Sequence, residues 1–369
     1  MVQGKNELEI SFVLPTFNER KNIIPLLNEL LELSNIHKIE IIVVDDNSTD
    51  NTSSLVRESA KKDLRIRLIN RLGRSGLSSA IKEGCLNATG EIIAIMDTDG
   101  QHEVRAIIIA IQKLLTNKLD LVFGSRFIKE SSVKGLSQER EELSILANKL
   151  ARVTLSKNYR HLTDFMSGCI VLKRETCLSF IKKVDVNGFK FLYELLAISR
   201  GKLKVGETPL FFQPRRYGVS KLDVAIIWDF LVSLIHTLFR RIFPRKAISF
   251  ALVGAIGVFV QLCAAYGLMT FSNLNFEKAL PFAVVVAACS NFLINNWLTF
   301  SSNRLRNKAL LIGLFQFLLV SSLPIFANVG LATFFYSNIS ENTLLSQIAG
   351  IVVVFIWNYA ASSRLVWNN

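Results

Sequence analysis

Short apolar segments alternate with amphipathic segments along the first 240 residues. Six short apolar runs have the length and composition of buried strands: 9–14, 39–44, 65–69, 91–96, 120–124 and 169–172. Between them, apolar residues recur at helical spacing over 20–33, 51–62, 77–87 and 103–117. Alternation of strands and helices predicts a Rossmann-like α/β domain with a mostly parallel sheet.

The last third of the chain is apolar and has no regular polar face. From residue 247 onward it contains seven charged residues, namely Glu277, Lys278, Arg304, Arg306, Lys308, Glu341 and Arg364. The uncharged runs between them exceed the ~20 residues that cross a bilayer, whereas soluble helices of this length carry a polar face. We therefore expect four transmembrane helices, at about 247–271, 279–300, 309–336 and 343–363.

This apolar part repeats itself. "NFLINNWLTF" begins at Asn291 and "NYAASSRLVW" begins at Asn358, 67 positions later, and the same offset pairs Phe250 with Phe317. The pattern predicts two copies of a two-helix unit, arranged as parallel repeats.

Two further segments have amphipathic character. The stretch 222–239 is apolar but contains Asp223, Asp229 and His236, which favours a helix lying on a membrane surface rather than crossing it. The stretch 142–155 has apolar residues at helical spacing. The predicted domains are 1–221, a linker at 222–246 with the interfacial helix and a basic segment, and 247–369.

The net charge of +13 does not indicate a nucleic-acid partner, because much of the excess lies at 240–246 and 303–308, beside the expected spans. Basic loops favour the cytoplasmic side, so both termini and the α/β domain are expected there, in an integral, multi-pass membrane protein. The first residues lack the apolar core and cleavage site of a signal peptide. The five cysteines form no C-x-x-C pair, so neither a disulfide framework nor a cysteine metal site is expected.

Polar clusters follow four of the predicted strands: "PTFNE", "DDNSTD", "DTDGQH" and "GSR". In parallel sheets, ligands bind at the carboxyl ends of the strands. Asp97 and Asp99 would face the same way on an extended chain, and with Gln101 they offer the hard oxygen ligands that suit Mg²⁺ or Mn²⁺. Asp46 could accept hydrogen bonds from a nucleobase or ribose, whereas Ser48 or Asp50 would cap the next helix.

The ordered motifs "LPTFNE", "VVDDNSTD", "RSGLSSAIKEG", "MDTDGQH", "FGSRF", "DFMSGC" and "FQPRRYGVSKL" resemble those of a family 2 glycosyltransferase with the GT-A fold. More closely, they resemble the polyprenol-phosphate sugar synthases, of which dolichol-phosphate mannose synthase is the type. This resemblance covers about residues 8–235. The tail, with "NFLINNWLTF", is similar to a GtrA-type membrane domain.

The resemblance implies a set of site residues. The nucleoside pocket would be lined by Pro15, Phe17, Glu19, Val44 and Asp46. The metal and the donor diphosphate would be held by Asp97, Asp99 and Gln101, with Thr98 in the same loop. The phosphates would be gathered by Arg126, Arg140, Lys190, Arg215 and Lys221, with Arg126 and Arg140 on the acceptor phosphate. The catalytic residues would be Asp99, Arg126, Arg215 and Lys221. Phe17 in place of tyrosine and Gly100 in place of leucine depart from the common pattern, and Asp164 matches a position to which the residues alone assign no role.

The resemblance implies a glycosyltransferase that moves a hexose, first of all mannose from GDP-mannose, onto a polyprenyl or dolichyl phosphate by metal-dependent inverting displacement. An alternative reaction is the transfer of the sugar from UDP-glucose, or from another UDP-sugar, to undecaprenyl phosphate. A processive polysaccharide synthase is disfavoured, because "QPRRY" lacks the tryptophan of Q-x-x-R-W. An alternative of another class is a lipid-linked sugar flippase in the membrane part. The oligomeric state stays open, with a homo-oligomer among the allowed states.

Overall fold

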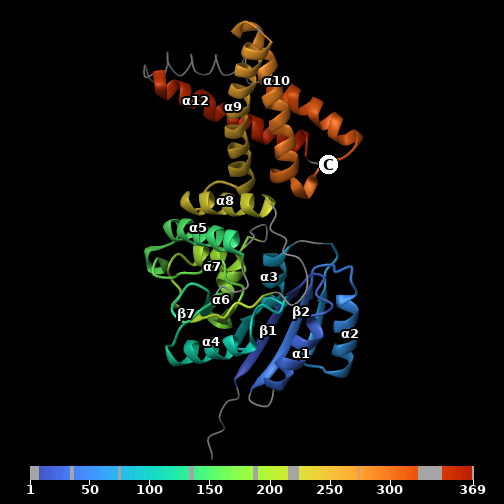
Figure 1. Ribbon diagram of the computed structural model, residues 1–369, viewed down its shortest axis with the longest axis vertical. Helices are drawn as coiled ribbons and strands as arrows, with labels where there is room; N and C mark the ends of the chain where they lie inside the picture. Colours follow the sequence, from blue (N-terminus) through green and yellow to red (C-terminus); the bar gives the residue numbers. More distant parts are fainter. Residues whose placement is uncertain are drawn as a thin grey trace, which may run out of the picture. The chain divides into compact units, whose positions relative to one another are not determined.

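The computed structural model describes residues 8–33, 37–73, 76–132, 137–185, 190–214, 224–272, 274–322 and 343–367, with the side chains of 276, 277 and 343–351 outside that description. The chain divides into two compact units, Met1–Leu238 and Phe239–Asn369 (Figure 1). This division falls within the predicted linker, and the domain bounds given above stay predictions.

The first unit is built on one seven-stranded sheet, in the order β3-β2-β1-β4-β6-β5-β7. The strands are β1 (Glu9–Thr16), β2 (Lys38–Asp45), β3 (Ile66–Asn70), β4 (Ile92–Ile95), β5 (Leu121–Ser125), β6 (Ile170–Lys173) and β7 (Val205–Pro209). All pairings are parallel except those of β6, which runs antiparallel to β4 and β5. Six strands were predicted. Strand β7 was not predicted, because it is an edge strand that is mostly only half-buried and so lacks a continuous apolar run.

Helices cover both faces of this sheet. They are α1 (Ile23–Glu32), α2 (Thr52–Lys62), α3 (Leu77–Asn87), α4 (Val104–Thr116), α5 (Gln138–Thr154), α6 (Arg174–Ile181), α7 (Phe191–Ser199) and α8 (Val224–Leu238). One apolar core joins α1, α2 and α4 to the sheet, and a second core joins it to α3, α6 and α7. The alternation of β2 separates the cores, because Ile41 and Val43 enter one while Ile42 and Val44 enter the other.

Helices α6 and α7 were not predicted. Eight of the nine residues of α7 are buried, so this helix has no polar face and no helical period that a sequence could reveal.

The direction of β6 decides which loops meet. The carboxyl ends of β1, β2, β4 and β5 lie at one edge of the sheet, as the parallel pairings require. Because β6 runs the other way, the segment before it, residues 164–169, also lies at this edge. The sheet therefore brings these segments together with the carboxyl ends of β3 and β7, which run parallel to β2 and β5.

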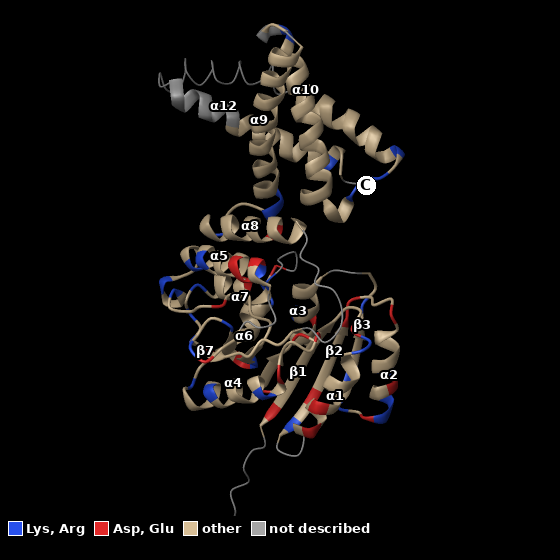
Figure 2. Cartoon of the chain, viewed as in Figure 1, with Lys and Arg blue, Asp and Glu red and all other residues tan. Residues whose placement is uncertain are grey.

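The second unit is helical. It contains α9 (Arg245–Phe271), α10 (Phe276–Ile294), a π-helical turn at Asn295–Thr299, a helix at Lys308–Ser322 and α12 (Thr343–Leu365). Two helices among the described residues, Arg245–Phe271 and Lys278–Thr299, are long and apolar enough to cross a membrane. Charged residues lie at the helix ends (Figure 2). The third predicted span extends into 323–342, outside the described residues. The fourth matches α12, and its passage across a membrane stays a prediction.

Ring contacts in this unit follow the predicted repeat. Phe250 packs against Tyr359 and Phe292 packs against Phe317, each with ring centroids 5.7 Å apart. Phe317 and Tyr359 lie 67 positions after Phe250 and Phe292, so each contact is the repeat equivalent of the other. When two copies of one unit pack about a twofold axis, each contact from the first copy to the second is matched by the same contact from the second copy to the first.

Candidate active site

The loop after β4 turns across the carboxyl edge of the sheet. Thr98 Oγ1 donates a hydrogen bond to the carbonyl of Pro15 at 3.1 Å, which ties this loop to β1. The buried carboxylate of Asp99 accepts the backbone N–H of Gln101 at 3.1 Å. Gly100 between them has φ +75°, a left-handed conformation that glycine adopts without a steric penalty. Glycine at position 100, where leucine is common in the resembling sequences, therefore allows the loop to adopt this conformation.

Asp97 has an unusual environment. Its Oδ1 atom is buried and has no hydrogen-bond partner among the described residues. Its Oδ2 atom lies so close to the backbone of Gly168 that a Cβ there would overlap it. A buried carboxylate oxygen without a partner is costly, and an ion is one of the groups that can complete it. Asp97 is thus a suitable ligand for a cation.

The donor set at this edge fits a divalent metal. No three His, Cys, Asp or Glu side chains converge on a metal position within the described residues. Mg²⁺ nevertheless needs only one or two carboxylates, because it takes further oxygens from substrate phosphates and water. Asp97 and Asp99 meet that requirement, and the Gln101 amide is oriented beside them by its N–H bond to the Gln213 carbonyl at 3.0 Å.

Arg126 follows β5 and is held by a buried carboxylate from the loop before β6. Its Nε atom lies 2.7 Å from Asp164 Oδ2, its Nη2 atom lies 2.8 Å from Oδ1, and its backbone N–H also donates to Oδ2. Burial would raise the pKa of Asp164, but the charge and hydrogen bonds of Arg126 outweigh this and lower it. Burial would likewise lower the pKa of Arg126, but Asp164 and, less strongly, Asp97 raise it. Asp164 therefore fixes the guanidinium in its charged form.

Lys190 joins this group from the start of α7. Its pKa is lowered to about 8, first by burial and then by repulsion from Arg126, while Asp97, Asp164 and Asp99 act in the opposite direction. These interactions place two cations and three carboxylates within electrostatic range of one another. The predicted residues Asp97, Asp99, Arg126 and Lys190 are thus brought together.

Arg140 lies in the first turn of α5. Four residues later on the same face, Ser144 Oγ accepts a hydrogen bond from Arg126 Nη2 at 3.3 Å. Arg140 therefore lies on the face of α5 that meets Arg126. Arg215 and Lys221, the other predicted phosphate ligands, lie outside the described residues.

The opposite side of the edge is formed by the loop after β2. Asp46 accepts a hydrogen bond from Arg71 Nη1 at 2.7 Å and from the backbone N–H of Gly76 at 2.8 Å. Arg71 also bonds Ser79 and pairs with Glu83 at 3.0 Å, so it connects this carboxylate to α3. Asp46 thus lies at the carboxyl edge of the sheet, as predicted, and there it accepts hydrogen bonds from Arg71 and Gly76.

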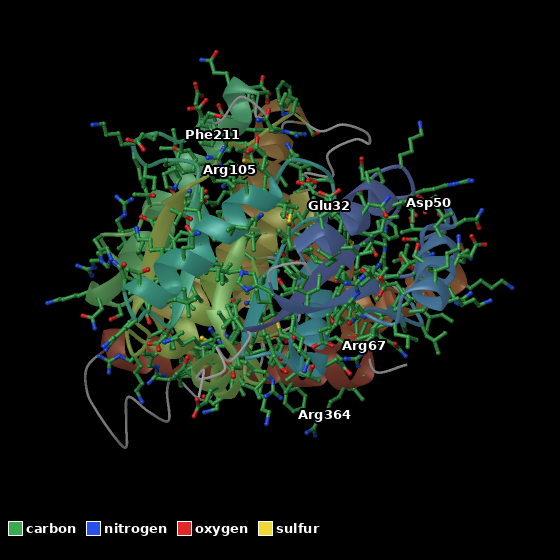
Figure 3. The ribbon with its side chains drawn as sticks, turned by 90° about the horizontal axis from the view of Figure 1, so that it is seen from below. Glu32, Asp50, Arg67, Arg105, Phe211 and Arg364 are labelled. Atoms are coloured by element: carbon green, nitrogen blue, oxygen red, sulfur yellow. The ribbon has the colours of Figure 1, made fainter. Side chains whose placement is uncertain are left out.

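The N-cap residue of α2 is Asn51, rather than Asp50 or Ser48 as predicted, and it makes no side-chain capping hydrogen bond. Asp50 precedes it, and the Oδ1 atom of Asp50 accepts the N–H of Thr52, the first residue of α2, at 3.0 Å. Asp50 lies at the periphery of the first unit (Figure 3). Ser48 instead bonds Asp45, at 2.6 Å between Oγ and Oδ1. Its N–H also donates to Asp45, so this acid closes the turn rather than facing a ligand.

The remaining residues predicted for the nucleoside pocket have different environments. Pro15 is buried at the end of β1, while Phe17 and Glu19 are half-buried in the loop that follows. Glu19 accepts a hydrogen bond from Asn22 at 2.7 Å at the start of α1. The side chain of Val44 is fully buried in the core beneath α3, so only its backbone could contact a ligand without rearrangement.

Both parts of the chain match known protein families. Residues 11–177 match the family described as glycosyl transferase family 2, and residues 249–367 match the family described as GtrA/DPMS, transmembrane domain. A dolichol-phosphate mannosyltransferase of Pyrococcus furiosus is 29% identical over 98% of this chain and 99% of its own length. That of Saccharomyces cerevisiae is 32% identical over 62% of this chain and 86% of its own length.

The chain belongs to glycosyltransferase family 2. This glycosyltransferase is a homologue of dolichol-phosphate mannosyltransferases and carries a GtrA/DPMS transmembrane domain. Among solved structures, glucosyl-3-phosphoglycerate synthase of Mycobacterium tuberculosis with Mg²⁺ and uridine diphosphate aligns at 20% identity and a TM-score of 0.48, covering 64% of this chain and 79% of that one.

Two side chains of this glycosyltransferase that shape the site were missed in the sequence analysis. The role of Asp164 could not be assigned, because its partner Arg126 is 38 positions away and β6 was not known to be antiparallel. Arg71 follows the end of β3, and its position after a strand was the signal that could have identified it.

Proposed function

We propose that this glycosyltransferase transfers mannose from GDP-mannose to a polyprenyl phosphate of the dolichyl type, at the cytoplasmic face of a membrane and with inversion at the anomeric carbon. The observation that carries the proposal is the meeting of Asp97 and Asp99 with Arg126 and Lys190 at the carboxyl edge of the sheet. Its near full-length similarity to a dolichol-phosphate mannosyltransferase supports the choice of sugar and acceptor.

The arrangement suits a nucleophile that needs no general base. A phosphate oxygen of the acceptor is already ionised at neutral pH. It would attack the anomeric carbon and form the new C–O bond. The bond from that carbon to the nucleoside diphosphate would break, and the leaving group would take the electron pair. The protein then has to orient two anions and offset their repulsion, which is a task for fixed cations.

Arg126 and Lys190 would perform that task in this chain. Arg126 presents a planar guanidinium that can bind phosphate oxygens through two N–H groups, and Asp164 prevents it from rotating away. The ring faces of Phe127 and Phe212, each with its centroid 5.3 Å from the guanidinium carbon, further restrict it. Lys190 would add a point charge from α7.

Asp97, Asp99 and Gln101 would hold the divalent metal, Mg²⁺ or Mn²⁺. When bound, the ion supplies positive charge beside the departing diphosphate. The buried Asp97 oxygen that lacks a hydrogen-bond partner supports this assignment, because a cation would compensate it.

The apolar surface of α5 and α8 supports a membrane-bound acceptor. These helices pack side by side in the first unit (Figure 1). They expose apolar side chains, namely Leu143, Leu146, Leu150, Val153, Val224, Ile227 and Leu231. Exposed apolar surface of this kind marks membrane or protein contact sites, and it would lie on the bilayer from which the acceptor phosphate is drawn.

A donor screen tests the proposal. Purified full-length protein in proteoliposomes containing a polyprenyl phosphate would receive GDP-mannose, UDP-glucose or another UDP-sugar, with and without a chelator. We expect lipid-linked mannose from GDP-mannose and its loss on chelation. Preference for a UDP-sugar would refute the donor, and equal transfer to a water-soluble alcohol would refute the lipid acceptor.

A further inference from the structure

A hollow of about 470 Å³ lies in the helical unit, between the end of α10 and the segment that leads to the helix Lys308–Ser322. Two arginines, Arg304 and Arg306, form one part of its lining. Trp297, Leu293 and Leu310 supply apolar surface. The hollow therefore combines two cations with an apolar wall.

The arginine segment is held in place by Asn296. The Oδ1 atom of Asn296 accepts the N–H of Leu305 at 2.8 Å, and its Nδ2 atom donates to the carbonyl of Leu305 at 3.1 Å. Trp367 Nε1 donates to the same Oδ1 atom at 3.1 Å. On the other side, Leu305 packs so tightly against Gly313 that a Cβ there would overlap its side chain. The backbone between Arg304 and Arg306 is thus fixed before any ligand arrives.

Asn296 belongs to the π-helical turn Asn295–Thr299. Such turns are rare and are frequent at functional sites, because they redirect side chains within an otherwise regular helix. Asn296 is 4% exposed although it lies in an apolar span. A buried amide that binds both backbone groups of one residue, Leu305, indicates a structure built to hold this segment.

Among the described residues, no carboxylate neutralises the charge of the hollow. Both arginines are exposed, and neither forms an ion pair with a described carboxylate. The span Lys278–Thr299 ends just before them, which puts Arg304 and Arg306 at a membrane interface if this helix crosses the bilayer. Trp297 and Leu293 are about half exposed beside them. An anionic head group with an attached apolar chain matches both parts of the lining.

We propose that this hollow binds the phosphate monoester head group of a membrane lipid, with the lipid chain against Trp297 and Leu293. A phosphate monoester carries up to two negative charges at neutral pH, whereas a phosphodiester carries one. Two guanidinium groups on either side of a fixed residue match the monoester better, because each can bind oxygens bidentately. The hollow belongs to the helical unit, whereas Arg126 and Lys190 belong to the first unit. It would give the chain a second binding site for a lipid of the acceptor class, and this role rests on the proposed function.

Native mass spectrometry of the full chain, released from bilayers of neutral phosphatidylcholine doped with a polyprenyl phosphate, tests this site. We expect two polyprenyl phosphates on the wild-type protein and one on the double variant Arg304→Gln/Arg306→Gln, with affinity for the second lipid reduced more than about tenfold. Lys308→Gln removes one charge from the same segment outside the hollow and should still bind two. Unchanged melting temperatures establish that the variants are folded.

Two further measurements distinguish a phosphate monoester lipid from other anions that could occupy the hollow. Equal occupancy by phosphatidylglycerol would reduce the site to a general anionic contact, and displacement by inorganic phosphate at equal concentration would make it a free-phosphate site. Either result would overturn the proposal, as would a second lipid that survives the double substitution. If the Arg304/Arg306 lipid is present but no donor yields a lipid-linked sugar, the proposed function fails while this site stands.

Discussion

Replacing Asp164 by asparagine tests whether the buried carboxylate acts through Arg126. Asp164 is fully buried and holds the guanidinium through bonds of 2.7 and 2.8 Å. Asparagine keeps the shape and one acceptor oxygen, but its amide nitrogen cannot accept the other N–H. One charge-assisted hydrogen bond is therefore lost, and Arg126 is left without its buried counter-charge.

The magnitude follows from that lost bond. A hydrogen bond to a charged group contributes about 1.5–3 kcal/mol, which corresponds to about 10- to 100-fold in kcat/KM if Arg126 must be fixed for transfer. The assay is lipid-linked sugar formation at several acceptor concentrations, with kcat and KM separated. Asp120→Asn serves as a control, because Asp120 accepts the N–H of Lys204 at 2.8 Å away from the site.

A double-mutant cycle with Arg126→Gln distinguishes positioning from a general loss of stability. If Asp164 acts through Arg126, its substitution should cost little once Arg126 is gone, with a coupling energy above about 1 kcal/mol. Unchanged kcat/KM in Asp164→Asn, or losses that simply multiply in the double variant, would refute the reasoning.

Three other predictions follow from the same structure. Asp99→Asn should lower transfer by more than about a hundredfold, and added Mn²⁺ should restore chelated wild-type protein but not the variant, as a transfer assay would measure. Gly168→Ala should displace the Asp97 carboxylate and weaken Mn²⁺ binding measured by calorimetry; equal binding in Gly168→Ala and Gly254→Ala, which has open space, would contradict this. Burial would raise the pKa of Glu40, but hydrogen bonds, first from Ser11 and then from Thr89 and Arg67, lower it to about 2. Glu40→Gln should therefore lower the melting temperature at pH 7, and the difference should shrink as the pH falls from about 4.5 towards 2, because the carboxylate loses its advantage there; a constant difference would exclude this cause.

Local pattern was enough for much of the fold. Apolar runs bounded by polar clusters located six strands, since a strand buried on both faces must be apolar along its length. The same logic located α9 and α10, because a lipid-facing helix tolerates no regular polar face. Helix α7 was not predicted because it is buried on nearly all sides, and strand β7 was not predicted because it lies at the edge of the sheet.

Some features of the candidate site could likewise be predicted from the sequence, and others could not. Asp97 and Asp99 were recognisable in the sequence because they directly follow a strand and sit two positions apart. The partnership of Arg126 with Asp164 and the closeness of Gly168 to Asp97 were decided by the tertiary structure, through the antiparallel course of β6. Hydrophobic periodicity reports which side of an element is buried, whereas strand direction depends on pairing between distant segments. The sequence pattern therefore identified the candidate metal ligands, and only the tertiary structure determined which residues surround them.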